Sequence, residues 1–482
     1  MPTIAEVYQG LTGKPPPHGG EQPVADWVAD SRLVSQGAAF VAVPGERTDG
    51  HNYIGEALAR GAVVVIAERA RFAPTETPAT VVDVAAPDVD ALTPPVVFLV
   101  DESLHAVQEL AAWWRARANP ALRVVGVTGS VGKTTVKELT AAVLAQRFRT
   151  FKSRGNYNSD IGLPLTLLTM PLDTERAVLE MAMTRRGEIA RLAEIARPHV
   201  GIVTNVEPVH LERLGSIEAI AAAKAELVEA LPPDGVAILN GDNEWVRAMR
   251  DKAPCRVFTY GLSPDNDLWA SDIVSHGLEG ISFRFHYGDE TVFARLPLLG
   301  RHSVHGALAA ASVGLLEGQP WSEIIGAWRK LAQMERLRIV VVPGVNGSTL
   351  IDDTYNASPP SVLAALNLLA DLNGRKVAVL GDMLELGEYE RKGHELVGIR
   401  AAEVADLLVT VGPRAHLTAD AARSAGMPPD RIIEVEDRQE AIARLREVLQ
   451  PGDMVLVKAS RGIRLDEVVN ALAVSPHERG ER

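Results

Sequence analysis

The chain has 482 residues, of which 46% are hydrophobic and 23% are charged, and its formal net charge is −13. This length exceeds what one core usually supports, so about two to four domains are expected, and the acidic balance argues against a nucleic-acid partner. The single cysteine, Cys255, excludes an internal disulfide framework, and the sequence shows neither a signal-peptide pattern nor about 18 consecutive apolar residues. We therefore expect a cytoplasmic multidomain enzyme with no membrane span and no nucleic-acid partner.

Residues 1–99 contain three apolar runs, at 38–43, 62–66 and 96–100, that predict short strands. A helical pattern near 54–60 lies between the first two, so we predict a small α/β domain. Two polar stretches, at 30–32 and 49–52, are by composition typical of surface turns. Helical spacing over 104–118 predicts a helix that leads into the next domain.

A phosphate-binding loop is predicted at residues 124–136. A β-branched run ends at Thr128, and a turn with Gly129 and Gly132 follows, where the backbone can approach an anion closely. Lys133 offers a charge to the outer phosphates, and Thr134 offers a hydroxyl to Mg²⁺ at the start of a helix. The spacing departs from the general P-loop, whose first glycine would fall at Val127. We still predict a nucleoside triphosphate site. Its residues are Thr128, Gly129, Ser130, Val131, Gly132, Lys133, Thr134 and Thr135.

Two further strands of this central region end on residues that suit a metal. A buried strand ends on Glu180, and the next strand, at 199–206, leads to His210. In a parallel sheet the carboxyl ends of the strands gather ligands, so Thr134, Glu180 and His210 are expected to converge on a Mg²⁺–nucleotide site. The polar loop at 152–164, with Asn156 and Asn158, has room for function.

From about residue 333 the pattern becomes a clean alternation of strand and helix, which predicts a doubly wound, Rossmann-like α/β domain. Strands are expected at 349–352, 376–380, 406–411, 431–435 and 453–458. A helix is expected to start at Ser358, with Pro359 in its first turn. Polar residues again follow the strand ends: Asp352, Asp353, Tyr355, Asn356, Asp382, Glu385, Ser460 and Arg461.

In combination these motifs resemble the Mur ligases, which build the peptide stem of bacterial cell-wall precursors. The resemblance rests on residues 128–135 together with Glu180, His210 and Lys224. Further marks are spread over nearly the whole chain. They are the stretches 30–32, 155–158, 161–166, 352–359, 381–387 and 458–461.

The resemblance implies three domains: a UDP-sugar substrate-binding domain at 1–99, an ATP-binding P-loop domain at 100–332 and a Rossmann-like ligase domain at 333–482. It implies an ATP-dependent amide ligase that forms an acyl phosphate and releases ADP and phosphate. The 381–387 run is typical of the branch that joins D-alanyl-D-alanine to UDP-N-acetylmuramoyl-tripeptide in peptidoglycan precursor synthesis. The implied protein acts as a monomer on small-molecule substrates.

The resemblance also implies roles for individual residues. It implies catalytic roles for Lys133, Lys224, His210 and Arg336, and nucleotide contacts from the loop, His302, Arg336 and Asp353. Two Mg²⁺ ions would bind at Thr134, Glu180, His210 and Lys224, the second through carbamylated Lys224, although the local pattern alone predicts a solvated helix lysine there. Closure of the C-terminal domain would bring Arg336 to the phosphates and Asp353 to the ribose. The implied substrate residues are Ser31, Arg32, Asn156, Asn158, Tyr355, Asn356, Asp382, Glu385, Ser460 and Arg461.

Several positions depart from the family pattern. Ser303 and Gly306 stand where the family usually has asparagines near the adenine. Ala182 replaces a glycine, and Ser159 stands where the family often has a second asparagine. Two alternatives stay open. One is an amide ligase of the same fold with another acceptor or amine, such as a folylpolyglutamate-like enzyme or one that forms another cell-wall amide. The other is a nonenzymatic ATP-binding relative. The third residue of the substrate peptide is left undetermined.

Overall fold

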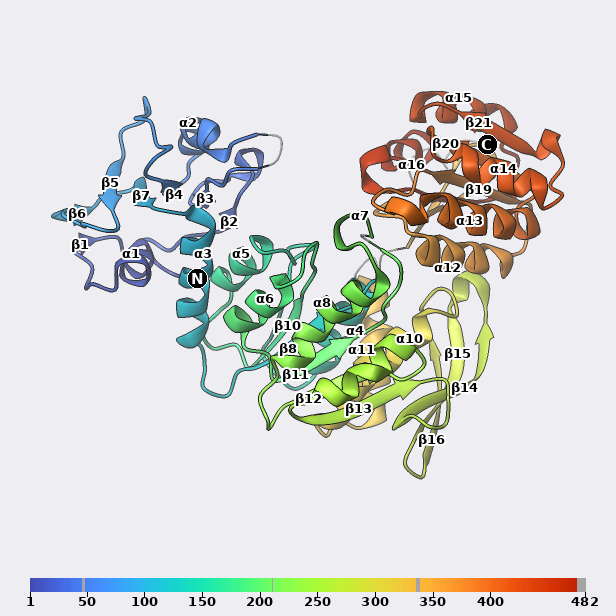
Figure 1. Cartoon of the computed structure of the whole chain (residues 1–482), viewed down its shortest axis with the longest axis horizontal. Helices are drawn as coiled ribbons and strands as arrows, with labels where there is room; N and C mark the ends of the chain where they lie inside the picture. The colour runs from blue at the N-terminus through green and yellow to red at the C-terminus, as the bar shows by residue number, and fades with distance from the viewer. Residues whose placement is uncertain (46–47, 210, 335–338, 475–482) are drawn as a thin grey trace.

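Three sheets follow one another along the chain, each with its own helices (Figure 1). The computed structural model describes residues 1–45, 48–209, 211–334 and 339–474. The fold is mixed α/β with mostly parallel sheets, which confirms the predicted class. No helix in these ranges is long and apolar enough to cross a membrane.

The first sheet is parallel and has the strand order β2-β3-β4-β7-β5. Its strands are Trp27–Val28 (β2), Ala39–Val41 (β3), Val64–Glu68 (β4), Thr80–Asp83 (β5) and Val96–Val100 (β7), with Ile54–Ala59 (α2) after β3. A separate pair joins His18–Gly19 (β1) to Ala91–Leu92 (β6). The helices Ile4–Thr12 (α1) and Ser103–Ala116 (α3) complete this part.

The central sheet has nine strands in the order β16-β15-β14-β13-β12-β11-β8-β10-β9. Pairing is parallel from β9 to β14 and antiparallel from β14 to β16. Its strands are Arg123–Thr128 (β8), Thr150–Lys152 (β9), Arg176–Glu180 (β10), Val200–Val203 (β11), Val236–Asn240 (β12), Arg256–Gly261 (β13), Leu268–Ser275 (β14), Ile281–Tyr287 (β15) and Glu290–Leu296 (β16). Its helices are Lys133–Leu144 (α4), Gly162–Leu168 (α5), Glu188–Ala196 (α6), Leu211–Leu214 (α7), Ile217–Glu229 (α8), Glu244–Arg247 (α9), Ser303–Leu316 (α10) and Trp321–Met334 (α11).

The third sheet has the order β17-β18-β22-β19-β20-β21 and is parallel except for the edge strand β17. Its strands are Val340–Pro343 (β17), Thr349–Asp352 (β18), Lys376–Gly381 (β19), Leu407–Val411 (β20), Ile432–Val435 (β21) and Met454–Lys458 (β22). Its helices are Pro359–Ala370 (α12), Glu390–Val404 (α13), His416–Ser424 (α14), Arg438–Val448 (α15) and Asp466–Leu472 (α16). The predicted start of α12 is confirmed, because Ser358 forms a capping box with Ser361.

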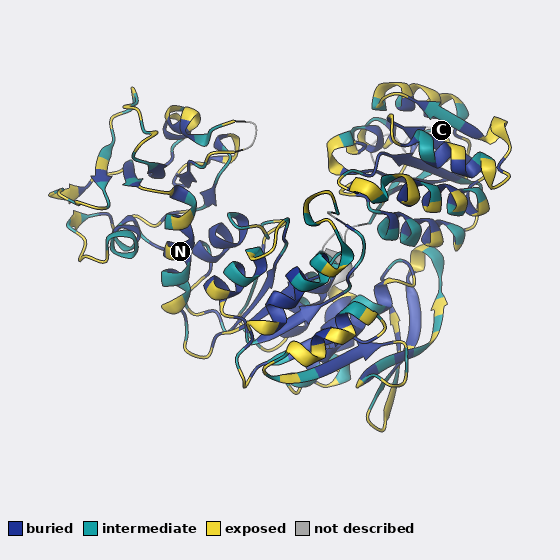
Figure 2. Cartoon of the chain, viewed as in Figure 1, coloured by how far each residue is buried: buried dark blue, intermediate teal, exposed yellow. Residues whose placement is uncertain are grey.

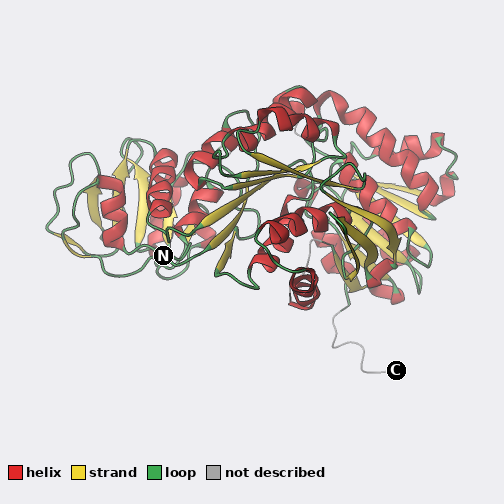
Figure 3. Cartoon of the chain, turned by 90° about the horizontal axis from the view of Figure 1, so that it is seen from below, coloured by secondary structure: helices red, strands yellow, loops and turns green. Residues whose placement is uncertain are grey.

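The N-terminal and central parts share a hydrophobic core, whereas the C-terminal part has cores of its own; Figure 2 shows the buried residues. One apolar cluster runs from Ile4 and Phe98 through Trp114 of α3 to Leu165 and Leu179 of the central part. The third sheet instead has its own core on each face, with helices on both sides (Figure 3). The N-terminal and central parts are therefore packed into one another, whereas the C-terminal part is a separately cored unit.

Candidate active site

The predicted phosphate loop lies between β8 and α4. Gly129 has φ +146°, and a Cβ there would overlap the hydroxyl of Thr204, while Gly132 has φ +85° and caps α4. The Val131 N–H donates to Asn205 Oδ1 at 2.8 Å, and Lys133 Nζ donates to the Gly129 carbonyl at 2.7 Å. This geometry aims the amides at the start of α4 into an open turn, which is an arrangement that binds phosphate.

An oxygen-rich donor set lies beside the loop. Thr134 Oγ1 donates to Glu180 Oε2 at 3.0 Å, and Asn158 Nδ2 donates to Glu180 Oε1 at 2.8 Å. Glu180 is only 2% exposed. A hydroxyl and a carboxylate are hard oxygen ligands of the kind that Mg²⁺ prefers, so the donor set fits this ion. The described ranges contain no group of three His, Cys, Asp or Glu residues suited to a metal, and His210 lies outside them.

Lys224 on α8 is buried, with 3% of its surface exposed. The alternative of a solvated helix lysine is therefore wrong. Burial, and then the nearby charge of Lys133, lower the pKa of Lys224 well below its usual range. Its ammonium has neither a hydrogen bond nor a salt bridge within the described part of the chain. Lys224 is thus a buried amine that feels the charge of Lys133 and has no counter-charge among the described residues.

Lys137 is a site residue that the sequence reasoning missed. It is fully buried on α4, and its Nζ lies 3.0 Å from the Gly155 carbonyl, 3.1 Å from Glu138 Oε1 and 3.9 Å from Glu180 Oε2. Its position three residues after Thr134 places it on the same helix face. That spacing is the signal that could have found it.

A cavity of 630 Å³ joins the phosphate loop to the C-terminal part. Its lining residues include Lys133, Glu180, Asn158 and His302 from the central part and Asp353, Tyr355, Asn356 and Lys458 from the C-terminal part. Burial lowers the pKa of His302. The cavity thus brings together nucleotide and substrate residues that the resemblance assigned to two different domains, whereas Arg336 lies outside the described residues.

A buried ion pair forms part of the far wall of this cavity. Lys458 Nζ lies 2.6 Å from Asp353 Oδ2 and donates to the Asn356 carbonyl at 2.8 Å. Lys458 belongs to a motif that carried the resemblance, but it was not among the predicted site residues.

Replacing Lys458 with Met should lower the free energy of unfolding of the C-terminal part by about 3–5 kcal/mol, because Asp353 would remain buried and charged without a partner. Urea unfolding followed by circular dichroism measures this change. A double variant that also carries Asp353→Leu should lose much less than the single variant. Equal losses in both would show that the unpaired carboxylate is not the cause.

The two positions that replace the usual asparagines lie three residues apart on α10 and have different neighbours. Ser303 lines the cavity beside His302, and its hydroxyl donates to the Leu299 carbonyl at 2.6 Å. Gly306 instead faces α4, where an added Cβ would lie 3.6 Å from Thr135. His305 is held by Asp242 at 2.8 Å. Of these positions, Ser303 is the one at which an amide side chain could reach into the cavity.

The Ser303→Asn variant should prefer ATP over GTP more strongly than the parent, because an amide can both donate to and accept from the adenine edge. A hydrogen bond of this kind contributes about 0.5–1.5 kcal/mol, or roughly 2- to 13-fold in the ratio of kcat/KM for the two nucleotides. Ser303→Ala is the control and should show no gain. If the parent already excludes GTP and the asparagine changes nothing, then adenine is recognised by other residues.

The substrate residues predicted in the C-terminal part fall into two groups. Tyr355, Asn356, Glu385 and Arg461 are exposed, and the Arg461 guanidinium lies 5.8 Å from the Tyr355 ring centre. Asp382 and Ser460 are buried: Asp382 Oδ1 accepts from the Arg414 and Ala415 N–H groups, and Ser460 Oγ accepts from the Leu384 N–H.

The loop that carries Glu385 touches the central part directly. Gly387 has φ +54°, and a Cβ there would lie 3.1 Å from the Glu212 Cα. This approach to α7 leaves no room for a side chain, which explains the glycine of the 381–387 run.

The remaining predicted substrate residues lie elsewhere. Ser31 is buried and donates to Glu56 at 3.2 Å, while Arg32 is exposed and pairs with Asp30 at 2.7 Å. Neither lines the cavity of 630 Å³. Asn156 is exposed in the loop after β9, and its carbonyl accepts from the Asn158 N–H. Asn158 itself contacts the metal candidate Glu180.

A P-loop, a buried carboxylate beside its threonine and a cavity shared with a second α/β unit define a nucleotide-binding enzyme of the P-loop class. Three Mur ligase family descriptions match the chain: "Mur ligase family, catalytic domain" at 28–113, "Mur ligase middle domain" at 127–314 and "Mur ligase, glutamate ligase domain" at 336–461. The chain is 36% identical to the UDP-N-acetylmuramoyl-tripeptide–D-alanyl-D-alanine ligase of Bacillus subtilis, over 98% of both chains. The chain belongs to the Mur ligase family.

Solved structures agree with this assignment. A crystal structure of MurF from Acinetobacter baumannii matches with a TM-score of 0.80 at 29% identity, covering 98% of both chains. MurF from Thermotoga maritima, in complex with ADP, matches with a TM-score of 0.74 at 30% identity, covering 93% of this chain and 97% of that one.

Proposed function

We propose that this protein is an ATP-dependent ligase that joins D-alanyl-D-alanine to UDP-N-acetylmuramoyl-tripeptide through an acyl phosphate. The observation that carries the proposal is the cavity in which Lys133 and Glu180 face Asp353 and Asn356 across two domains. Such a reaction needs positive charge on the transferring phosphoryl group and a site that excludes water. Lys133 would supply the charge, and a cavity lined by two domains would shelter the phosphoryl group from water.

Each residue of the phosphate side has a defined task in this proposal. The amides from Gly132 to Thr135 would bind the phosphates, since Asn205 already accepts from the Ser130 and Val131 N–H groups, and Lys133 would neutralise charge on the outer phosphates. Thr134 and Glu180 would hold Mg²⁺, which when bound polarises the phosphoryl oxygens. Asn158 and Lys137 orient the Glu180 carboxylate, and His210 would complete the set. From the far side, Asp353 and His302 would contact the nucleoside, and Arg336 the phosphates.

We also propose that Lys224 acts as its carbamate and holds a second Mg²⁺. The support is its burial and the absence of a counter-charge within the described residues. An ammonium cannot ligate a cation, whereas a carbamate presents two oxygens, as a carboxylate does.

We propose that the two substrates bind to domains at opposite ends of the chain. Ser31 and Arg32 of the domain at 1–99 would bind the UDP-sugar, and Asn156 the peptide. Tyr355, Asn356, Glu385 and Arg461 of the domain at 333–482 would receive the amine. The buried residues Asp382 and Ser460 would hold the loop that carries Glu385 in place. We propose a cytoplasmic location, since ATP and both substrates are small soluble molecules of that compartment, and we propose that the chain acts as a monomer.

ADP release measured with UDP-N-acetylmuramoyl-tripeptide and a panel of amines tests the function. D-Alanyl-D-alanine should give the fastest release, well above a control without amine. Release with a single amino acid but not with the dipeptide would favour the alternative ligase with another amine. No release with any amine would favour the nonenzymatic relative. The tripeptide should be supplied with either lysine or meso-diaminopimelate, which also identifies the third residue.

A further inference from the structure

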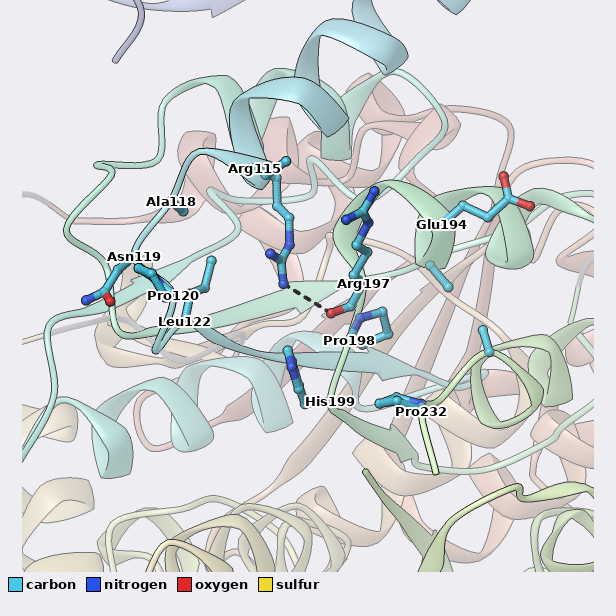
Figure 4. A pocket seen from close by; sticks show the side chains of 13 residues that line it. Arg115, Ala118, Asn119, Pro120, Leu122, Glu194, Arg197, Pro198, His199 and Pro232 are labelled. Carbon is cyan, nitrogen blue, oxygen red and sulfur yellow. Dashed lines mark hydrogen bonds between the residues drawn. The ribbon is translucent and has the colours of Figure 1, made fainter. Parts of the chain in front are cut away.

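A second cavity, of 800 Å³, lies at the end of the central sheet where β8 and β11 begin (Figure 4). It is bounded by the C-terminal ends of α3, α6 and α8 and by the segments that enter β8 and β11. These strands start here and end at the ligase site. None of its lining residues has a role in the proposed ligase reaction.

Two arginines lie side by side in this cavity (Figure 4). Arg115 Nε donates to the Ala196 carbonyl at 2.9 Å, and its Nη2 donates to the Arg197 carbonyl at 3.4 Å. Neither Arg115 nor Arg197 has a carboxylate within 4.0 Å in the part of the chain that the structure describes. Burial, and then the charge of Arg197, lower the pKa of Arg115. The Arg115 guanidinium is thus held by carbonyls at the C-terminal end of α6, Arg197 is exposed, and no carboxylate among the described residues balances the charge of the pair.

The surrounding charges do not cancel this pair. The Glu194 carboxylate points away from the arginines and is paired with Arg191 at 3.1 Å (Figure 4). His199 lines the floor, and burial followed by the charges of Arg115 and Arg123 lowers its pKa, with Asp234 acting weakly in the other direction.

Arg197 itself has a left-handed backbone conformation, with φ +50°. It ends α6 at a position that favours glycine or asparagine. An arginine there costs free energy that a glycine would not cost. The left-handed backbone would favour a glycine, whereas Arg197 places an exposed guanidinium at the cavity.

We propose that this cavity binds a small organic anion, in which a phosphate or carboxylate group is carried on an apolar body. The planar guanidinium groups match the geometry of such oxyanions. Part of the lining around them is apolar, with Leu122, Pro198 and Pro232, and part is polar, with Asn119 and His199. The volume lies within the range of about 300–1,000 Å³ that small-molecule sites occupy. A simpler interpretation is that Arg115 only caps α6, but this accounts for neither Arg197 nor the lack of a carboxylate.

Calorimetric titration with 1-naphthyl phosphate tests the site in the full chain. Saturating ADP and Mg²⁺ keep the probe out of the ligase cavity. The parent should bind the probe, and binding should weaken as salt is added. The neutral 1-naphthol and free inorganic phosphate should each bind at least about ten-fold more weakly, since each lacks one half of the proposed ligand.

The decisive variant is Arg197→Gly, which removes the guanidinium and relieves the backbone. It should bind the probe about ten-fold more weakly or worse and yet melt at a higher temperature than the parent. Arg250→Gln removes an exposed arginine elsewhere in the central part and should bind as the parent does. Unchanged binding by Arg197→Gly, or no binding by the parent, would overturn the proposal. Ligase activity does not enter this readout, so the two proposals fail separately.

Discussion

The Lys224→Ala variant is expected to lose at least about 100-fold in kcat, because the proposed carbamate would leave with the side chain. Addition of acetate or another short carboxylic acid should restore part of the turnover. Lys224 is buried in α8, so alanine leaves a space in which a carboxylate can take the place of the carbamate. Initial rates of ADP release with and without acetate are the measurement.

Two further variants serve as controls for that result. Lys224→Met is also inactive in this view, but acetate should not rescue it, because methionine fills the space. Lys330→Ala removes an exposed lysine from α11 and should behave as the parent does. Full activity of Lys224→Ala without acetate, or equal rescue of the alanine and methionine variants, would contradict the carbamate.

The Glu180→Gln variant is expected to lower kcat by at least about 100-fold and to raise the Mg²⁺ concentration needed for half-maximal rate. The amide is nearly the same size but has no charge and one oxygen instead of two. It cannot accept from both Thr134 and Asn158, which hold the two carboxylate oxygens at 3.0 and 2.8 Å. Steady-state rates over a Mg²⁺ titration measure both effects.

The matched control is Glu229→Gln on the exposed end of α8, where the carboxylate pairs with Lys252 at 2.8 Å. This variant should keep the Mg²⁺ dependence of the parent. A Glu180→Gln enzyme with unchanged Mg²⁺ dependence but a lower rate would move Glu180 from metal binding to the support of the phosphate loop.

Much of the site could be predicted from the local spacing of residues in the sequence. The strand, glycine turn and helix start around Lys133 lie within 13 residues, so their backbone follows from residue types next to one another. The placement of Glu180 at the end of β10 was equally local, because a short apolar run ended on it. The fold class followed from the alternation of strand and helix, and the structure confirms it.

Other features could not be predicted because distant segments create them. The antiparallel strands β15 and β16 extend the central sheet, yet the apolar alternation that forms them was not recognised. The motif predicts that Asn158 binds substrate, but its side-chain amide donates a hydrogen bond to Glu180, which lies 22 residues later in the chain. Contacts of this kind depend on how loops fold back over the sheet.

The sequence by itself determined the class of fold, the phosphate loop and the family, since each is written in short motifs or in the period of apolar residues. Only the tertiary structure decided which charged groups are buried and with whom. Lys224 has the local pattern of a solvated lysine but is 3% exposed. Lys458 forms an ion pair with Asp353, which lies 105 residues earlier in the chain. The physical reason is that backbone conformation follows from neighbours in the chain, whereas burial, and with it the charge state of a lysine, follows from neighbours in space.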